Sequence, residues 1–311
     1  MKVLLPGNID LDVTAPSGVE LVVFDPSRPV PDEHTDAEVL VTWGQTADQL
    51  RAEAARLTRV RWVQTLAAGP DAVLAAGFGR EVVGTCGRGL HDLTVAEHTV
   101  ALLLAGVRRI GDMVHAQDER YWSPELGGLQ PLHPADRLTT LIGARVVIWG
   151  FGSIGRTVAR YLAAMGVEVR GVARSSGERD GFPVSDDIDA ELPHADAVIM
   201  VLPATEETAA AMDARRLALL PDTAWLVNVG RGATVDEDAL VAALRSGTLG
   251  GAALDVTATE PLPASSPLWD APNILISPHA AGGRPVGADE LVSRNLAAYR
   301  QGGELREVVA R

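Results

Sequence analysis

Short apolar runs alternate with helical stretches through the first third of the chain. Residues 21–24 and 39–41 consist of Leu, Val and Phe, which is typical of buried strands, whereas residues 47–57 place apolar side chains at helical spacing. Residues 81–86 form a further strand-like stretch. Because strands alternate with helices, the pattern predicts a parallel sheet.

The pattern changes in the middle of the chain. Residues 94–110 carry a long helical periodicity, with Thr94 as the expected N-cap and Glu97 completing a capping box. Residues 121–140 contain three prolines, two adjacent glycines and little periodicity, so we expect a long irregular loop. Loops of this length in compact domains are usually functional.

From residue 145 onward, short apolar strands are separated by helical crossovers, which predicts a doubly wound sheet. The predicted strands are 146–149, 167–172, 197–202, 224–229, 251–255 and 274–276. A last helix, predicted at 288–299, is expected to pack back on the first lobe.

Length and charge limit the fold and its partners. A chain of 311 residues fits two compact domains, expected at 1–92 with 283–311 and at 93–282, and two lobes suggest a cleft for a ligand. The formal net charge of −14 opposes attraction to nucleic acid or to an anionic membrane. An anionic ligand therefore needs a local basic site.

Cysteine usage and the N-terminus indicate the compartment. The single cysteine, Cys86, cannot form an internal disulfide and ends a strand-like stretch, so we interpret it as a buried structural thiol. No signal peptide, membrane-spanning run or metal-binding spacing is evident. We therefore expect a cytoplasmic protein without a bound metal.

A glycine-rich turn joins strand 146–149 to a helix at 156–165. It reads Gly150-Phe151-Gly152-Ser153-Ile154-Gly155. The first glycine would permit a tight turn, the second a close approach to pyrophosphate, and the third close packing of helix on strand. Because free amides at the helix start attract anions, this context predicts a dinucleotide-binding site.

The strand that follows ends at Arg174, where an NAD-selective protein would place Asp or Glu. A carboxylate there would bind the ribose hydroxyls and repel a 2′-phosphate, whereas Arg174, Ser175 and Ser176 offer donors to that phosphate. The sequence therefore favours NADP, with NAD as the alternative cofactor.

Polar segments follow three of the later strands, where the carboxyl ends of a doubly wound sheet converge on the ligand crevice. They are Asn228-Val229-Gly230-Arg231-Gly232, Asp255 through Glu260, and Ser277-Pro278-His279-Ala280-Ala281-Gly282. Further motifs are Thr94-Val95-Ala96-Glu97-His98 and Leu202-Pro203-Ala204-Thr205-Glu206-Glu207-Thr208. Together they resemble the D-isomer-specific 2-hydroxyacid dehydrogenase family over nearly the whole chain.

The resemblance implies an α/β fold of two doubly wound parallel-sheet lobes: a flavodoxin-like substrate domain (1–92 and 283–311) and a Rossmann cofactor domain (93–282). It also implies a triad of Arg231, Glu260 and His279, and reduction of a 2-oxo acid calls for the same residue types. Arg231 would bind the carboxylate and polarise the carbonyl. His279 would donate the proton, and Glu260 would orient its imidazole and favour the protonated form.

Further site residues are implied by the resemblance. The additional cofactor contacts are Leu202, Pro203, Thr208, Val229, Gly230 and Asp255, the last facing the nicotinamide carboxamide or adjacent backbone. The expected substrate contacts besides Arg231 and His279 are Trp43, Gly44, Ala68 and Gly69, although Trp43 fits the core equally well. The other histidines are interpreted as structural or surface residues, and His98 as part of the helical core or an interface.

The resemblance favours a glyoxylate or hydroxypyruvate reductase. Two alternatives remain open: NAD-dependent oxidation of formate or phosphite, against which Arg174 argues, and an idle nucleotide sensor or corepressor, against which the intact triad argues. Apolar surface on the helix from Thr94 and around Trp122 predicts a homodimer.

Overall fold

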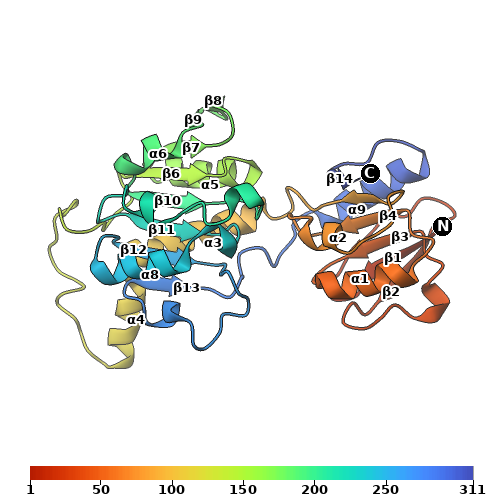
Figure 1. Ribbon diagram of the computed structural model, residues 1–311, viewed down its shortest axis with the longest axis horizontal. Helices are drawn as coiled ribbons and strands as arrows, with labels where there is room; N and C mark the ends of the chain where they lie inside the picture. Colours follow the sequence, from red (N-terminus) through yellow and green to blue (C-terminus); the bar gives the residue numbers. More distant parts are fainter. Residues whose placement is uncertain (311) are drawn as a thin grey trace. The chain divides into compact units, whose positions relative to one another are not determined.

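The computed structural model describes residues 1–310 and divides into two compact units. One unit comprises Met1–Asp92 together with the chain from Arg284, and the other comprises Leu93–Gly283. The second break thus falls after Gly283, one residue later than the sequence pattern places it. Each unit has its own sheet with helices on both faces, which confirms the predicted α/β fold class (Figure 1).

The sheet of the first unit has the order β14-β5-β4-β3-β1-β2 and is parallel except for β14. Its strands are β1 (Lys2–Pro6), β2 (Glu20–Phe24), β3 (Val39–Thr42), β4 (Trp62–Thr65), β5 (Val83–Thr85) and β14 (Val308–Ala310). Its helices are α1 (Ala47–Arg56), α2 (Asp71–Ala75) and α9 (Ala288–Arg300).

Successive side chains of each strand point to opposite faces of this sheet, and both faces are buried. Leu4 and Leu40 pack with Leu50 of α1, whereas Val3 on the opposite face packs with Val292 of α9. The expected return of the last helix to the first lobe is therefore confirmed.

The sheet of the second unit has the order β13-β12-β11-β10-β6-β7-β9-β8 and is parallel except for β8. Its strands are β6 (Arg145–Trp149), β7 (Glu168–Val172), β8 (Gly177–Arg179), β9 (Phe182–Ser185), β10 (Ala197–Met200), β11 (Trp225–Asn228), β12 (Gly251–Leu254) and β13 (Ile274–Ile276). The six predicted strands are confirmed to within two residues at each end, and the hairpin of β8 and β9 was not predicted.

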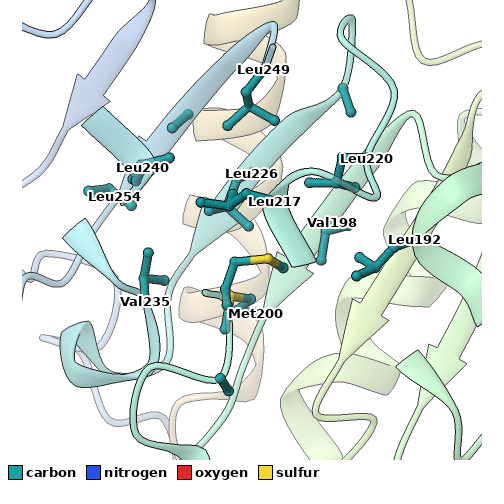
Figure 2. Close-up of a cluster of buried hydrophobic side chains, with 14 of the residues drawn as sticks. Leu192, Val198, Met200, Leu217, Leu220, Leu226, Val235, Leu240, Leu249 and Leu254 are labelled. Carbon is teal, nitrogen blue, oxygen red and sulfur yellow. The ribbon is translucent and has the colours of Figure 1, made fainter. Parts of the chain in front are cut away.

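Helices cover both faces of this second sheet. They are α3 (Asp92–Val107), α5 (Ser153–Ala164), α6 (Ile188–Glu191), α7 (Ala214–Leu217) and α8 (Glu237–Ser246), whereas α4 (Ile110–Asp118) has no buried residue. Leu103 of α3 and Leu162 of α5 are buried against one face. On the other face, Leu217 and Leu240 pack with Leu226, as Figure 2 shows.

The start of α3 differs from the prediction. The helix begins at Asp92, so Thr94 lies within its first turn and is not the N-cap. An aspartate in that first turn favours the earlier start, because its charge complements the helix dipole. The helix ends at Val107, and Arg109 adopts a left-handed conformation (φ 54°) before α4.

The chain between α4 and β6 contains neither helix nor strand, which confirms the predicted loop at 121–140. Within residues 1–310, no helix is long and apolar enough to cross a membrane.

Candidate active site

The glycine-rich turn connects β6 to α5, as the sequence predicts. Gly150 has φ +100°, and a Cβ there would lie 2.5 Å from the Val201 carbonyl oxygen. A Cβ at Gly155 would lie 2.7 Å from the Gly150 carbonyl oxygen, so glycine lets the helix start close to the strand. Steric contact therefore explains two of the three glycines.

Gly152 has a different environment. It is the N-cap of α5, makes no side-chain capping bond, and its Cβ position has no atom within 4 Å. The first turn of α5 thus presents backbone amides toward open space, and these amides favour an anion. This open cradle fits a dinucleotide pyrophosphate.

Neighbouring strand ends form the walls of this cradle. A Cβ at Gly230 would lie 2.6 Å from the backbone nitrogen of Leu202, so the two backbones are in close contact. The Thr208 hydroxyl donates to the Pro203 carbonyl at 2.6 Å and fixes the loop after β10. The side chains of Phe151, Leu202 and Val229 are buried, so the surface they offer to a ligand is mainly backbone.

Arg174, Ser175 and Ser176 lie exposed on the loop between β7 and β8. Arg174 forms no hydrogen bond or ion pair with any other residue in the described chain. Its guanidinium is therefore available to an external anion. Such a group suits a phosphate, since it carries a fixed charge and several donors.

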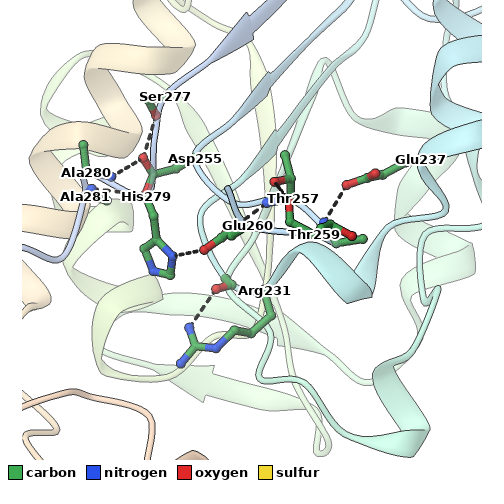
Figure 3. A network of polar contacts seen from close by, with 12 residues as sticks. Arg231, Glu237, Asp255, Thr257, Thr259, Glu260, Ser277, His279, Ala280 and Ala281 are labelled. Atoms are coloured by element: carbon green, nitrogen blue, oxygen red, sulfur yellow. Dashed lines mark hydrogen bonds and ion pairs between the residues drawn. The ribbon is translucent and has the colours of Figure 1, made fainter. Parts of the chain in front are cut away.

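His279 and Glu260 form a direct contact. The imidazole Nδ1 lies 2.7 Å from Oε2 of Glu260, with exposed side-chain fractions of 48% and 38% (Figure 3). The other Glu260 oxygen accepts from the backbone N–H of Thr257 at 3.1 Å. The carboxylate is thus held in place and in turn fixes the ring orientation.

Asp255 supports the turn that carries His279. Its side chain is 1% exposed and accepts from the Ser277 hydroxyl at 2.6 Å and from the amides of Ala280 and Ala281 at 2.8 and 3.1 Å (Figure 3). The Asp255 carbonyl oxygen also accepts from the His279 amide at 2.8 Å. Each carboxylate oxygen of Asp255 therefore accepts a hydrogen bond from the backbone that directly follows His279.

His98 joins this network from α3. Its Nε2 lies 3.0 Å from the Ser277 hydroxyl oxygen and 3.2 Å from Oδ1 of Asp255. Sequence reasoning gave His98 no specific contact, because its partner Ser277 lies 179 positions later and leaves no local signal. The structure identifies it as a polar neighbour of the buried carboxylate.

Arg231 follows β11, and strand register places it near the other two residues. Asn228 at the end of β11 pairs with Leu254 of β12, which pairs with Ile276 of β13. The segments after these three strands therefore leave one edge of the sheet side by side. A Cβ at Gly232 would lie 1.9 Å from the Thr257 carbonyl carbon, so the chain beside Arg231 packs directly on the loop that holds Glu260.

The Arg231 side chain is half-buried and donates from Nη1 to the Gly230 carbonyl at 2.8 Å. Figure 3 shows its side chain together with those of Glu260 and His279. The second unit alone thus brings an arginine, a carboxylate and a histidine to one sheet edge.

The predicted substrate residues of the first unit lie on two loops. The amides of Ala68 and Gly69 make no hydrogen bond within residues 1–310, so they can receive an anion. Trp43 is half-buried and stacks on His91, with ring centroids 5.5 Å apart and planes 17° apart. Gly44 follows it with φ +76°.

Comparisons with known proteins identify the family. Residues 100–281 match the family model of the D-isomer specific 2-hydroxyacid dehydrogenase NAD binding domain. Glyoxylate/hydroxypyruvate reductase A of Serratia proteamaculans is 33% identical over 285 residues, covering 88% of this chain and 86% of that protein.

Solved structures show the same likeness over the whole chain. A D-isomer specific 2-hydroxyacid dehydrogenase family protein from Aeromonas salmonicida has a TM-score of 0.82 and 29% identity, covering 99% of this chain and 98% of the other. An NADPH-dependent glyoxylate/hydroxypyruvate reductase from Sinorhizobium meliloti, solved with NADP and sulfate, has a TM-score of 0.77 and 28% identity, covering 99% and 98%. The chain described here belongs to the D-isomer specific 2-hydroxyacid dehydrogenase family.

Proposed function

We propose that this dehydrogenase reduces a small 2-oxo acid of the glyoxylate or hydroxypyruvate type with NADPH. The observation that carries the proposal is the 2.7 Å contact between His279 and Glu260, on the same sheet edge as Arg231. The similarity to glyoxylate/hydroxypyruvate reductases supports the substrate class.

Each residue of this group has a distinct role. The Arg231 guanidinium binds the substrate carboxylate and polarises the carbonyl, because its planar donor fork matches both oxygens. His279 donates a proton from Nε2 to the substrate oxygen that becomes the hydroxyl. Glu260 accepts from Nδ1 and keeps Nε2 directed at the substrate. When bound, the reduced nicotinamide supplies the hydride.

The cofactor site combines the glycine turn with the loop after β7. Residues Gly150 to Gly155 would hold the pyrophosphate, and Arg174, Ser175 and Ser176 the 2′-phosphate. Backbone of Leu202, Pro203, Thr208, Val229 and Gly230 would line the remainder, with Asp255 supporting the nicotinamide end from beneath. The free Arg174 guanidinium supports the choice of NADP over NAD.

Substrate contacts in the first unit are assigned to Ala68 and Gly69, whose unpaired amides suit a carboxylate. Trp43 and Gly44 are assigned to the pocket wall.

We further propose a homodimer in a reducing cytoplasm. Trp122 is 93% exposed, and Met113, Tyr121 and Leu126 line the same hollow beside α4. An apolar surface of this kind suits contact with a second copy. The one cysteine, Cys86, is a buried free thiol, which suits a reducing compartment.

The decisive experiment is a turnover assay with NADPH and with NADH. Glyoxylate, hydroxypyruvate and pyruvate are tested for reduction, and formate and phosphite for oxidation. We expect NADPH-dependent reduction of glyoxylate or hydroxypyruvate. NAD-dependent oxidation of formate or phosphite would contradict the proposal, and cofactor binding without turnover of any acid would indicate a nucleotide sensor.

A further inference from the structure

The β8–β9 hairpin lies directly after the loop that carries Arg174. Strand β8 spans Gly177–Arg179, and β9 spans Phe182–Ser185. The turn between them uses left-handed conformations at Asp180 and Gly181, with φ 54° and 82°. The hairpin therefore folds back at once, and Arg179 is the last residue of β8 before this turn.

One guanidinium connects this loop to the glycine turn. Arg179 donates from Nη1 to the Phe151 carbonyl at 3.1 Å. Its Nη2 donates to the Ser175 carbonyl at 3.2 Å and to the Ser175 hydroxyl oxygen at 2.9 Å. A planar fork with several donors can reach both backbone segments at once, which a lysine ammonium cannot do with the same geometry.

These contacts also direct the Ser175 hydroxyl. Because its oxygen accepts from Arg179, the hydroxyl hydrogen remains available to a different acceptor. Ser175 itself is exposed. The hydroxyl is thus prepared to donate to an anion outside the protein.

The nearby charges leave Arg179 positive. Asp180 pairs with Arg156 at 3.2 Å and with Arg160 at 3.8 Å, and Arg179 forms no ion pair within the described chain. The neighbouring Glu178 is exposed and, in the part of the chain that the structure describes, forms no ion pair with Arg179. Arg179 therefore adds an uncompensated charge beside the loop of Arg174.

We infer that Arg179 is a positioning residue that sets the preference for a 2′-phosphorylated cofactor. It fixes Ser175 and the backbone of the loop relative to the glycine turn, and its charge favours a phosphate there over a ribose hydroxyl. This inference rests on the proposed use of NADP.

The test measures dissociation constants rather than turnover. NADPH, NADH, adenosine 2′,5′-bisphosphate and AMP are titrated into the wild-type protein and into Arg179→Ala and Arg179→Lys. Arg160→Ala is the matched control, since Arg160 is 59% exposed and contacts Asp180 but neither Ser175 nor Phe151.

We expect Arg179→Ala to weaken the binding of NADPH and of adenosine 2′,5′-bisphosphate about tenfold or more. The reason is the loss of the charge-assisted hydrogen bonds from Arg179 to Ser175 and Phe151, which position the loop. NADH and AMP should change less than about threefold by the same reasoning. Arg179→Lys should restore only part of the NADPH affinity, and Arg160→Ala should keep the wild-type ratio. Arg179→Lys retains the charge and the stem, so it provides the readout if the alanine variant unfolds.

Two contrary outcomes are distinguishable. If the wild-type protein prefers NADPH but both Arg179 variants keep its NADPH to NADH ratio, the role of Arg179 is wrong and the choice of NADP stands. If the wild-type protein binds NADH as tightly as NADPH and shows no preference for adenosine 2′,5′-bisphosphate over AMP, the role of Arg179 and the choice of NADP are both overturned.

Discussion

The imidazole Nδ1 of His279 lies 2.7 Å from the Glu260 carboxylate, while the backbone of His279 adopts φ 52°. An ionised carboxylate only accepts hydrogen bonds, so Nδ1 carries the hydrogen and Nε2 is left for proton transfer. The left-handed backbone is held by the hydrogen bond that the His279 N–H donates to the Asp255 carbonyl oxygen. Ring and backbone are therefore fixed by different residues, which separate variants can test.

Replacing His279 by alanine should lower kcat for glyoxylate reduction by about 10²- to 10⁴-fold, the usual contribution of a general acid. NADPH affinity should remain unchanged, because the glycine turn and Arg174 are untouched. Steady-state kinetics and a fluorescence titration of NADPH measure the two quantities.

Glu260→Gln is the companion variant. Its amide oxygen can still accept from Nδ1, so it retains the ring orientation and removes only the charge. A smaller loss of kcat than in His279→Ala is expected. Near-normal kcat in His279→Ala would refute the assignment of the proton donor.

Replacing Arg174 by aspartate should reverse the cofactor preference. The carboxylate would repel a 2′-phosphate and bind the ribose hydroxyls, so kcat/KM should fall with NADPH and rise with NADH. Arg245→Asp, at an exposed position in α8, makes the same charge change and should leave the ratio of the two kcat/KM values unaltered. A ratio that moves equally in both variants would show a general charge effect.

Gly152→Ala should separate cofactor binding from stability. The new methyl group meets no protein atom within 4 Å, so the unfolding midpoint in urea should stay near that of the wild-type protein. It would project into the proposed pyrophosphate site, so NADPH affinity should fall.

Gly150→Ala provides the contrast to Gly152→Ala. Its Cβ would lie 2.5 Å from a carbonyl oxygen at φ +100°, so a stability loss of about 1–3 kcal/mol is expected from overpacking alone. Unchanged NADPH affinity in Gly152→Ala would contradict the placement of the pyrophosphate.

The Cys86 thiol should react slowly in the native protein. Burial raises the pKa of this thiol, so less thiolate is present at a given pH than in the unfolded chain. Alkylation at pH 8 should be slow in buffer and fast in urea.

The same shift affects stability. Because the folded-state pKa is raised, the contribution of the protonated thiol is fully present below the unfolded pKa and is lost as pH rises through the folded pKa. Between pH 7 and 10, the free energy of unfolding measured in urea should therefore fall more steeply for the wild-type protein than for Cys86→Ala. Equal slopes would contradict this effect of burial.

Light scattering at micromolar concentration should give twice the mass of one chain. Leu129 lies on the loop between α4 and β6 and is fully exposed, and Trp122 on the same loop is almost fully exposed. Leu129→Asp should therefore weaken a dimer formed through the apolar surface of this loop. Leu74→Asp, at an exposed apolar position of α2 in the first unit, is the control and should leave the mass unchanged. A monomer mass for the wild-type protein would refute the dimer.

Periodicity predicted the parallel sheets because each strand is a run of apolar residues bounded by polar turns. The β8–β9 hairpin escaped this reasoning because its strands, at 177–179 and 182–185, are short, β8 is the edge strand, and only Val184 in them is buried. Edge strands bury few side chains, so they leave little hydrophobic pattern. Arg179 was missed for the same reason.

The candidate site was predictable where its residues directly follow strands. Arg231, Asp255 and His279 come at most three residues after β11, β12 and β13, and adjacent strand ends converge. His98 was not predictable, because helix packing and not chain proximity brings it to Asp255. The start of α3 was misplaced because Asp92 and Thr94 are both suitable residues for a helix start.

The first unit is completed by a segment that follows the whole second unit in the sequence. Strand β14 pairs with β5, and the buried side chain of Asn295 in α9 donates to Gln64, 231 positions earlier. During synthesis, β1 to β5 therefore emerge well before the helix that covers one of their faces. Residues 93–283 form a continuous unit and can fold before α9 is made. The first unit therefore begins first but is completed after the second unit. Until α9 is made, Val3 and Val41 lack the cover of Val292 and Leu296, so an apolar face of the first sheet stays open to solvent.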